Sequence, residues 1–311
     1  MDLYAGPSLA RYSFGDGHPF GPDRFEVFWE RVQHSGLADR AKVREPRNGS
    51  REDLLLFHTE DYINRVAALS RIGRGMLDPD TPVFKGIYEA ALTVVGTVLE
   101  AVSRIVDGST RTAFVPIAGL HHAHRDHSSG FCVFNDCAVA VQALRVRHGL
   151  RPVAYVDIDA HHADGVFYGL EDDPDVIFAD IHEDGRYLFP GTGDSSERGR
   201  GTAVGRKLNI PLAPGADDAL FHEAWPRVEE LLVRLEPEFI LFQCGADSIR
   251  DDPLTDLNFS VSAHRYATER LVALANRLCG GRLIALGGGG YNRRNVADAW
   301  STVVETLIDS E

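Results

Sequence analysis

Three side chains that can bind a metal follow one apolar stretch in the middle of this 311-residue chain. The stretch VAYVDIDAHHADG (153–165) begins with four apolar residues and then places Asp157, Asp159 and His161 at alternate positions. On an extended segment these three side chains share one face. Two carboxylates on one face repel each other unless a cation or a proton lies between them, and Asp with His is a common ligand set for zinc and other divalent metals. The pattern predicts a metal site, although a polar strand end that frays into a loop would explain an Asp-x-Asp pair alone.

A further metal ligand is expected at the end of another strand, because a catalytic zinc typically has three protein ligands and one open position. In FILFQCGADSIRDDP (239–253) an apolar strand runs into Gly245 and Ala246, whose small size allows close backbone approach, and then reaches Asp247. A helix N-cap would also explain Asp247 taken alone. Beside the first cluster, we interpret Asp247 as the third ligand.

A pair of histidines follows a third predicted strand. In IAGLHHAHRDHSSGFCVFND (117–136), His121 and His122 stand directly after the apolar run. Imidazoles beside a metal suit general acid–base chemistry. Each would need a carboxylate to orient it, and Asp157 and Asp164 are two nearby acids without another assignment.

The same segment also contains residues with weaker signals. Gly130 and Phe131 suggest a narrow apolar lining, unless Phe131 is an ordinary core residue. His124 and His127 are expected to be surface loop residues without a role in the chemistry.

A run of four glycines precedes a tyrosine near the C-terminus, in LIALGGGGYNRRN (283–295). The spacing matches neither of the common phosphate-binding motifs. The glycines more simply let the backbone pass close to the site and present Tyr291, whose phenol can donate to a developing oxyanion. A metal with an open position, two histidines and a phenolic donor are what the attack of water on an amide needs.

The surrounding sequence alternates short apolar runs with helical patterns, which predicts an α/β fold with a mostly parallel sheet covered by helices on both faces. In such sheets ligands bind at the carboxyl ends of the strands. The strand candidates are 112–117, 153–158, 176–181, 207–211, 239–243 and 282–286. The helical patterns lie near 24–35, 51–69, 86–107, 135–147, 217–235, 261–278 and 293–308. We expect one domain over residues 1–311.

Composition restricts the partners and the location of the protein. The chain is 44% hydrophobic and has a net charge of -14, so we expect a large core and no nucleic-acid partner. An acidic surface would attract cations such as lysine-rich peptides or polyamines, but on charge alone we favour the simpler interpretation that the acidity keeps the protein soluble. Four cysteines without a CxxC pair, no signal peptide and no apolar run of membrane-spanning length predict a cytoplasmic protein that does not bind membranes. The oligomeric state is left open.

These motifs together resemble the zinc-dependent histone deacetylase superfamily, above all its bacterial acetoin-utilisation-type members, with acetylpolyamine amidohydrolases as relatives. The resemblance extends over nearly the whole chain, through HPFGPDRF, DTPVFKGIYEAA, GLHHAHRDHSSGFCVFND, YVDIDAHHADGV, FPGTGD, QCGADSIRDDPL and GGGGYN. It implies the arginase/deacetylase-like fold, with a sheet of about eight strands.

The resemblance also implies specific roles. It implies one zinc ion per chain, with ferrous iron as the alternative in the cell, bound by Asp159, His161 and Asp247. It pairs His121 with Asp157 and His122 with Asp164, and makes His122 the usual general base. Tyr291 corresponds to the oxyanion tyrosine.

Other residues are implied to contact the substrate. Phe131 and Phe189 would flank a tunnel for the acyl-lysine, with Gly130 beside them. Asp80 would hold the substrate backbone at the rim, and Leu254 would make one side of the tunnel mouth aliphatic.

Two further sites are implied away from the substrate. Arg24 corresponds to an arginine near an internal channel for acetate release. The region of Asp157 corresponds to a structural potassium site, where Asp180 stands in place of the serine of many relatives and would alter cation binding.

The predicted activity is removal of acetyl or other acyl groups from the ε-amine of lysine in proteins. The main alternative is an acetylpolyamine amidohydrolase with the same chemistry. An arginase-like manganese enzyme is disfavoured because Ile249 stands where a further metal carboxylate would be needed. A binding module without catalytic activity is disfavoured because no catalytic group is missing.

Overall fold

A single sheet forms the centre of the molecule. The computed structural model describes residues 1–15 and 17–311, and these contain eight strands that all pair in parallel, in the order β2-β1-β3-β8-β7-β4-β5-β6. The strands are β1 (Asp2–Tyr4), β2 (Lys42–Arg44), β3 (Thr112–Val115), β4 (Val153–Asp157), β5 (Val176–Glu183), β6 (Lys207–Leu212), β7 (Phe239–Gln243) and β8 (Leu283–Leu286). The predicted α/β fold with a parallel sheet is confirmed.

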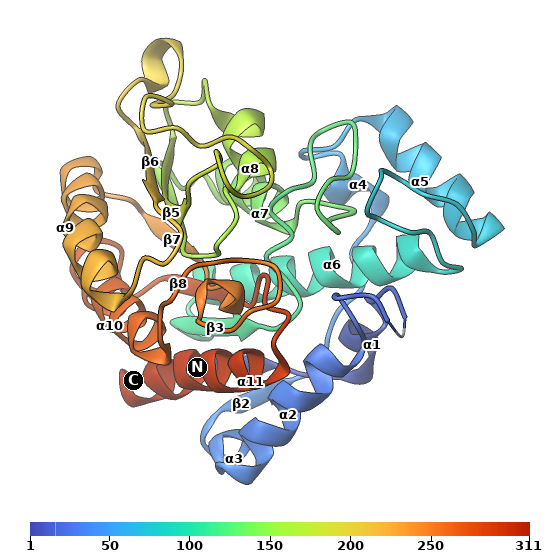
Figure 1. Cartoon of the computed structure of the whole chain (residues 1–311), viewed down its shortest axis with the longest axis horizontal. Coiled ribbons are helices and arrows are strands. Elements are labelled where there is room, and N and C mark those ends of the chain that lie inside the picture. The colour runs from blue at the N-terminus through green and yellow to red at the C-terminus, as the bar shows by residue number, and fades with distance from the viewer. Residues whose placement is uncertain (16) are drawn as a thin grey trace.

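Helices cover both faces of this sheet, as Figure 1 shows. The α-helices are α1 (Pro7–Ala10), α2 (Asp23–His34), α3 (Leu37–Arg40), α4 (Arg51–Leu54), α5 (Glu60–Ile72), α6 (Ile87–Val106), α7 (Asp136–His148), α8 (Asp164–Leu170), α9 (Asp218–Leu235), α10 (Val261–Leu278) and α11 (Arg293–Asp309). Two short 3-10 helices, η1 (Gly201–Ala203) and η2 (Ala246–Ser248), lie in loops. Helices α6, α7 and α8 pack together on one face, and α9, α10, α11 and α2 form the layer on the other. Because both faces are covered, the central strands β4 and β7 are buried at every position and are apolar up to their last residues, Asp157 and Gln243.

The strand register brings the chemistry-bearing segments together. Strand β4 lies between β7 and β5, so that Asp157 at its carboxyl end is opposite Gln243 on one side and Asp180 on the other. Strands β8 and β3 continue the sheet on the side of β7. The loops that follow β3, β4, β7 and β8 therefore leave the same edge of the sheet, which is where a parallel sheet places its ligands.

The shorter elements of the fold differ from the expectation. Strands β1 and β2 and helices α1, α3 and α8 were not predicted, because segments of three to seven residues carry too little periodicity to show a strand or a helix. The helical stretch expected over 51–69 is two helices, α4 and α5. Thr59 ends the intervening turn and caps α5 by accepting a hydrogen bond from the backbone N–H of Tyr62, at 3.4 Å.

The four cysteines are buried and form no disulfide bonds, as expected for small core residues. Burial raises the pKa of each thiol, which keeps them protonated and poorly nucleophilic. Within the described part of the chain, none of the helices combines the length and the apolar character needed to span a bilayer.

Candidate active site

Asp159, His161 and Asp247 form a buried cluster at the carboxyl edge of the sheet. One ligand atom from each lies within 4.8 Å of the others. The Nδ1 atom of His161 is 3.2 Å from Oδ1 of Asp159 and 3.2 Å from Oδ2 of Asp247. Asp159 and His161 come from the loop after β4, and Asp247 comes from η2 after β7. The set of one nitrogen and two carboxylate oxygens fits a divalent metal such as zinc.

Backbone and amide donors orient these carboxylates. Oδ2 of Asp159 accepts hydrogen bonds from Nε2 of Gln243 and from the N–H of Gly289, both at 2.8 Å. Oδ1 of Asp247 accepts one from the N–H of Ala160 at 3.0 Å. Each acid therefore keeps an oxygen for the space beside His161. The role of Gln243 was not predicted from the sequence. It follows from the pairing of β7 with β4, which places Gln243 opposite Asp157 and next to Asp159.

The glycine loop after β8 contacts the cluster directly. A Cβ atom on Gly289 would lie 2.0 Å from Oδ2 of Asp247, a distance that no side chain tolerates. The sequence-based expectation that the glycine run passes close to the site agrees with this geometry.

The charges of the cluster call for a cation. Burial and the neighbouring charge of Asp159 raise the pKa of Asp247 to about 7. Burial alone would lower the pKa of His161, but its hydrogen bonds to Asp159 and Asp247 raise it to about 10. A proton on His161 thus balances part of the negative charge of the two acids. A bound divalent cation would do so more completely, so the residues present fit a metal centre.

The tandem histidines lie beside this cluster, each with its own carboxylate. Nδ1 of His121 is 2.9 Å from Oδ2 of Asp157, and Nδ1 of His122 is 2.7 Å from Oδ1 of Asp164. The two Nε2 atoms are 3.0 Å apart. The structure thus brings together the predicted pairs, with both Nε2 atoms directed to one place. Burial and the adjacent His121 lower the pKa of His122 to about 4, so His122 is neutral near pH 7.

The start of α7 holds the histidine loop in place. The carboxylate of Asp136 accepts hydrogen bonds from the N–H groups of Gly119 and Leu120, both at 2.8 Å. Asn135 donates from its amide to the carbonyl of His121 at 3.1 Å. Neither residue was given a role from the sequence. Asn135 immediately before an apolar helix is a typical N-cap signal, and it does accept a hydrogen bond from the N–H of Ala138 at 2.8 Å, but the loop that it holds could not be inferred.

Tyr291 is half-buried at the end of the glycine loop. Its ring packs edge-on against Phe131, with 5.8 Å between ring centroids. Its backbone N–H donates to Oδ2 of Asp252 at 2.7 Å, and Asp252 also accepts from the N–H of Leu254 at 3.1 Å. Burial and the charge of Asp247 raise the pKa of Tyr291 well above its ordinary value, so its hydroxyl remains a donor.

Two phenylalanines line the approach to the histidines. Phe131 has a φ of 66°, and Tyr12 holds this strained turn by donating from its hydroxyl to the Phe131 carbonyl at 2.7 Å. The Phe189 ring lies 5.1 Å from the ring of His122. Gly130 lies against the rings of His122 and Phe189. A Cβ at this position would lie 2.5 Å from Cδ2 of His122 and 3.0 Å from the Phe189 ring, so only glycine fits here.

The outer residues of this lining reach solvent. Phe189 is 44% exposed and Leu254 is 37% exposed, which places both at the surface rather than in the core. Their contact with a substrate, like that of Phe131 and Gly130, stays a prediction.

Asp80 lies in the loop between α5 and α6. Its backbone carbonyl is 3.4 Å from Nε2 of His18, whose ring lies 4.7 Å from that of Phe131. Burial and the charge of Asp78 raise the pKa of Asp80 to about 6. The loop thus borders the Phe131 side of the opening, and the role of Asp80 in holding a substrate stays a prediction.

Arg24 is fully buried behind the glycine loop. Its guanidinium donates to the carbonyls of Gly288 and Gly290, at 2.6 and 2.8 Å, and lies 5.6 Å from the centre of the Tyr291 ring. Arg24 therefore positions the loop that carries Tyr291. Its part in an acetate channel is untested.

Asp180 is also buried, but its contacts differ from those of a free cation ligand. Oδ1 is 2.8 Å from Nδ1 of His182, and Oδ2 accepts a hydrogen bond from the N–H of Ala163 at 2.9 Å. Nε2 of His182 lies 3.0 Å from the carbonyl of Gly193. Because both ring nitrogens of His182 face acceptors, the ring is placed to carry a positive charge beside Asp180. The potassium site at Asp157 and Asp180 stays a prediction.

His124 has a contact that the sequence did not indicate. Its Nε2 atom is 3.3 Å from Oδ2 of Asp164, the acid that orients His122. Its ring stacks on that of His127, with 4.3 Å between centroids and 10° between planes. His124 was expected to have no role, whereas in the structure the carboxylate of Asp164 contacts both His124 and the catalytic candidate His122.

Comparison with known proteins identifies the family. Residues 18–307 match the model of the histone deacetylase domain. The chain belongs to the histone deacetylase family. Family members are metal-dependent hydrolases that act on amides, and this chain has a candidate metal-binding triad in Asp159, His161 and Asp247.

The similar proteins indicate the bacterial branch of the family. The chain is 40% identical over 308 residues to the acetoin utilization protein AcuC of Bacillus subtilis (strain 168), which covers 96% of this chain and 79% of that protein. It is 34% identical over 311 residues to AcuC of Staphylococcus aureus (strain MRSA252), covering 97% and 80%. The crystal structure of the HDA15 HD domain superposes with a TM-score of 0.91 at 24% identity, covering 99% of this chain and 90% of that one, which supports the shared fold.

Proposed function

We propose that this protein is a zinc-dependent deacetylase that removes acetyl groups from the ε-amine of lysine in proteins. The observation that carries the proposal is the pair of His–Asp contacts beside the metal-binding triad, with the two Nε2 atoms 3.0 Å apart. This arrangement supplies a base, an acid and a site for a cation within one buried space, which amide hydrolysis requires.

The triad and the histidines divide the chemistry. Asp159, His161 and Asp247 would hold the zinc ion, which would lower the pKa of water and polarise the acyl carbonyl. Neutral His122, whose Nδ1–H donates to Asp164, accepts the proton of the attacking water at Nε2. His122 then returns a proton to the leaving lysine amine, while His121 stays oriented by Asp157.

Tyr291 and the aromatic lining complete the mechanism. The hydroxyl of Tyr291 donates a hydrogen bond to the carbonyl oxygen as negative charge develops on it. Phe131 and Phe189 exclude water around the methylene chain of the lysine, and Asp80 accepts from the substrate backbone at the rim. Exclusion of water strengthens each of these polar contacts.

Protein lysine is the proposed substrate, rather than an acetylated polyamine. The sequence between the matched motifs has no long insertion that would narrow the mouth around a thin polyamine. The aromatic and aliphatic side chains at the opening suit a lysine side chain whose backbone stays outside. We also propose that the enzyme acts in the cytoplasm, with zinc, or ferrous iron as the alternative, in the metal site.

The test compares two substrates on one zinc-loaded preparation. We expect kcat/KM for an acetyl-lysine peptide to exceed that for acetylated putrescine or spermidine, and a hydroxamate to inhibit both reactions. The His122→Ala variant should bind zinc normally and have no measurable turnover. A higher kcat/KM for the acetylated polyamines would overturn the substrate assignment, and full activity of His122→Ala would overturn the mechanism.

A further inference from the structure

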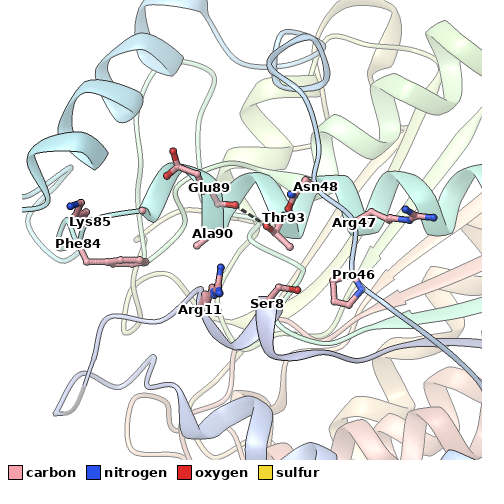
Figure 2. A pocket seen from close by; sticks show the side chains of 11 residues that line it. Ser8, Arg11, Pro46, Arg47, Asn48, Phe84, Lys85, Glu89, Ala90 and Thr93 are labelled. Carbon is pink, nitrogen blue, oxygen red and sulfur yellow. Dashed lines mark hydrogen bonds between the residues drawn. The ribbon is translucent and has the colours of Figure 1, made fainter.

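A large cavity lies on the surface away from the metal triad. It has a volume of about 1040 Å³ and lies between α1, the segment that follows β2, and the first half of α6. Figure 2 shows Arg11 rising into it from the side of α1, with Lys85 and Arg47 at its two ends. None of the residues that line it belongs to the candidate active site.

The charge of this cavity is opposite to that of the whole protein. Three cations, Arg11, Arg47 and Lys85, line it against a single carboxylate, that of Glu89, although the net charge of the chain is -14. Oε2 of Glu89 accepts a hydrogen bond from the hydroxyl of Ser70 at 3.1 Å. Within residues 1–15 and 17–311 the three cations make no ion pair, whereas Arg51 and Arg147, on neighbouring helices, bind Glu60 and Asp53.

The walls of the cavity add a helix end and apolar surface. Helix α6 begins here, so the positive end of its dipole lies at the cavity, although its first N–H groups are already paired. The N–H of Ile87 donates to the carbonyl of Phe84 and that of Tyr88 to the hydroxyl of Ser70, both at 3.2 Å. Phe84 and Pro46 form apolar walls at either end. Such a surface suits carboxylates carried on a chain that also has apolar contacts.

Three aromatic rings in successive contact, those of Phe84, Phe14 and Phe131, extend from this cavity to the candidate active site. The Phe84 ring lies 6.2 Å from that of Phe14, and Phe14 lies 6.4 Å from Phe131, which lines the approach to the histidines. The loop that ends in Phe84 also carries Asp80. An extended peptide advances about 3.3–3.6 Å per residue, so roughly four residues span the two ring-to-ring steps.

We propose that this cavity binds an acidic segment of the acetylated protein substrate, with Asp or Glu residues about three to six positions from the acetyl-lysine. The inference rests on the proposed function and extends it to the sequence around the modified lysine. A net charge of -14 by itself would attract cationic partners, but the groups at this cavity repel them, polyamines included.

The experiment uses two acetyl-lysine peptides of equal length, one with three Glu residues at these positions and one with Gln in their place. We expect the zinc-loaded enzyme to prefer the acidic peptide, through a lower KM with an unchanged kcat. In the double variant Arg11→Glu/Lys85→Glu, the ratio of kcat/KM for the acidic peptide to kcat/KM for the Gln peptide should fall about tenfold at low ionic strength. Each exposed ion pair contributes little by itself, but the reversed charges also repel the Glu residues of the peptide. Added salt should reduce the preference of the wild type.

A matched control separates local from overall charge. The double variant Arg227→Glu/Arg277→Glu makes the same change in net charge on α9 and α10, on the opposite side of the molecule in Figure 1, and should keep the preference for the acidic peptide. Both altered residues of the Arg11→Glu/Lys85→Glu variant are exposed and unpaired within the described chain, so its unfolding temperature should match that of the wild type.

The outcomes distinguish the two proposals. Hydrolysis of both peptides with equal kcat/KM, or a preference that the Arg11→Glu/Lys85→Glu variant keeps, would overturn the acidic-segment site and leave the deacetylase proposal intact. A zinc-loaded wild type that hydrolyses neither peptide would refute the proposed function, and this inference with it.

Discussion

Replacing Tyr291 with Phe removes one oxygen atom from the candidate site and little else. The Tyr291 ring packs against Phe131 with its centroid 5.8 Å away, and its backbone N–H binds Asp252, so both contacts remain in the variant. No hydrogen bond from the Tyr291 hydroxyl to another described residue is present that the change would break. The variant should therefore fold with an unchanged unfolding temperature and bind one equivalent of zinc.

The expected loss lies in kcat. The high pKa of Tyr291 keeps its hydroxyl a donor across the neutral range. Loss of a single preorganised oxyanion donor from a water-excluded site typically costs about 10²–10³ in kcat, or about 3–4 kcal/mol. Because the hydrogen bond forms in the transition state, KM for an acetyl-lysine peptide should change little.

The assay measures kcat and KM on that peptide for the wild type, Tyr291→Phe and a control, Tyr266→Phe. Tyr266 lies on α10, where its ring packs against His222 and Trp225 of α9. The control should have wild-type kinetics. A kcat for Tyr291→Phe within about threefold of the wild type would remove the hydroxyl from the mechanism, since the loss of a true oxyanion donor is far larger.

Four further changes test other parts of the site. Gly289→Ala should abolish stoichiometric metal binding, because its Cβ would overlap Oδ2 of Asp247; full metal content by elemental analysis would contradict this. Asp136→Asn should lower stability by about 1–3 kcal/mol in urea unfolding and reduce kcat, since an amide cannot accept both loop N–H groups; unchanged values would show that the loop holds itself. His124→Ala should lower kcat about three- to tenfold with the metal retained, and unchanged kcat would make its carboxylate contact incidental. The folded pKa of Asp80, about 6, lies above its ordinary value of 3.8, so the contribution of Asp80 to stability falls as pH rises from about 4 to 6; the stability of the wild type relative to Asp80→Asn should therefore decrease over that range, and a difference that does not change with pH would refute this.

The parts of the site that lie on one short segment were accessible from the sequence. Asp159 and His161 follow an apolar strand at alternate positions, and parallel strands bring Asp247 to the same edge, so elementary geometry was enough to associate them. The helix and strand patterns also predicted the parallel sheet, apart from strands too short to show a period.

Residues that act through tertiary contacts were not accessible in this way. Gln243, Asp136 and Asp252 each hold a functional group that lies far away in the sequence, and no local pattern distinguishes them from ordinary polar residues. The contact of His124 with Asp164 likewise depends on how the histidine loop folds back over α8. The break between α4 and α5 was missed because the apolar pattern continues through it, while Thr59 caps the second helix.

The most direct test of the account is a zinc titration of chelator-treated enzyme, with bound metal and turnover of an acetyl-lysine peptide measured on the same samples. The metal centre at Asp159, His161 and Asp247 predicts no turnover without metal and full recovery at one equivalent of zinc. An Asp247→Ala variant should bind no zinc and stay inactive. Turnover by the metal-free enzyme, or one equivalent of tightly bound zinc in Asp247→Ala, would contradict the account.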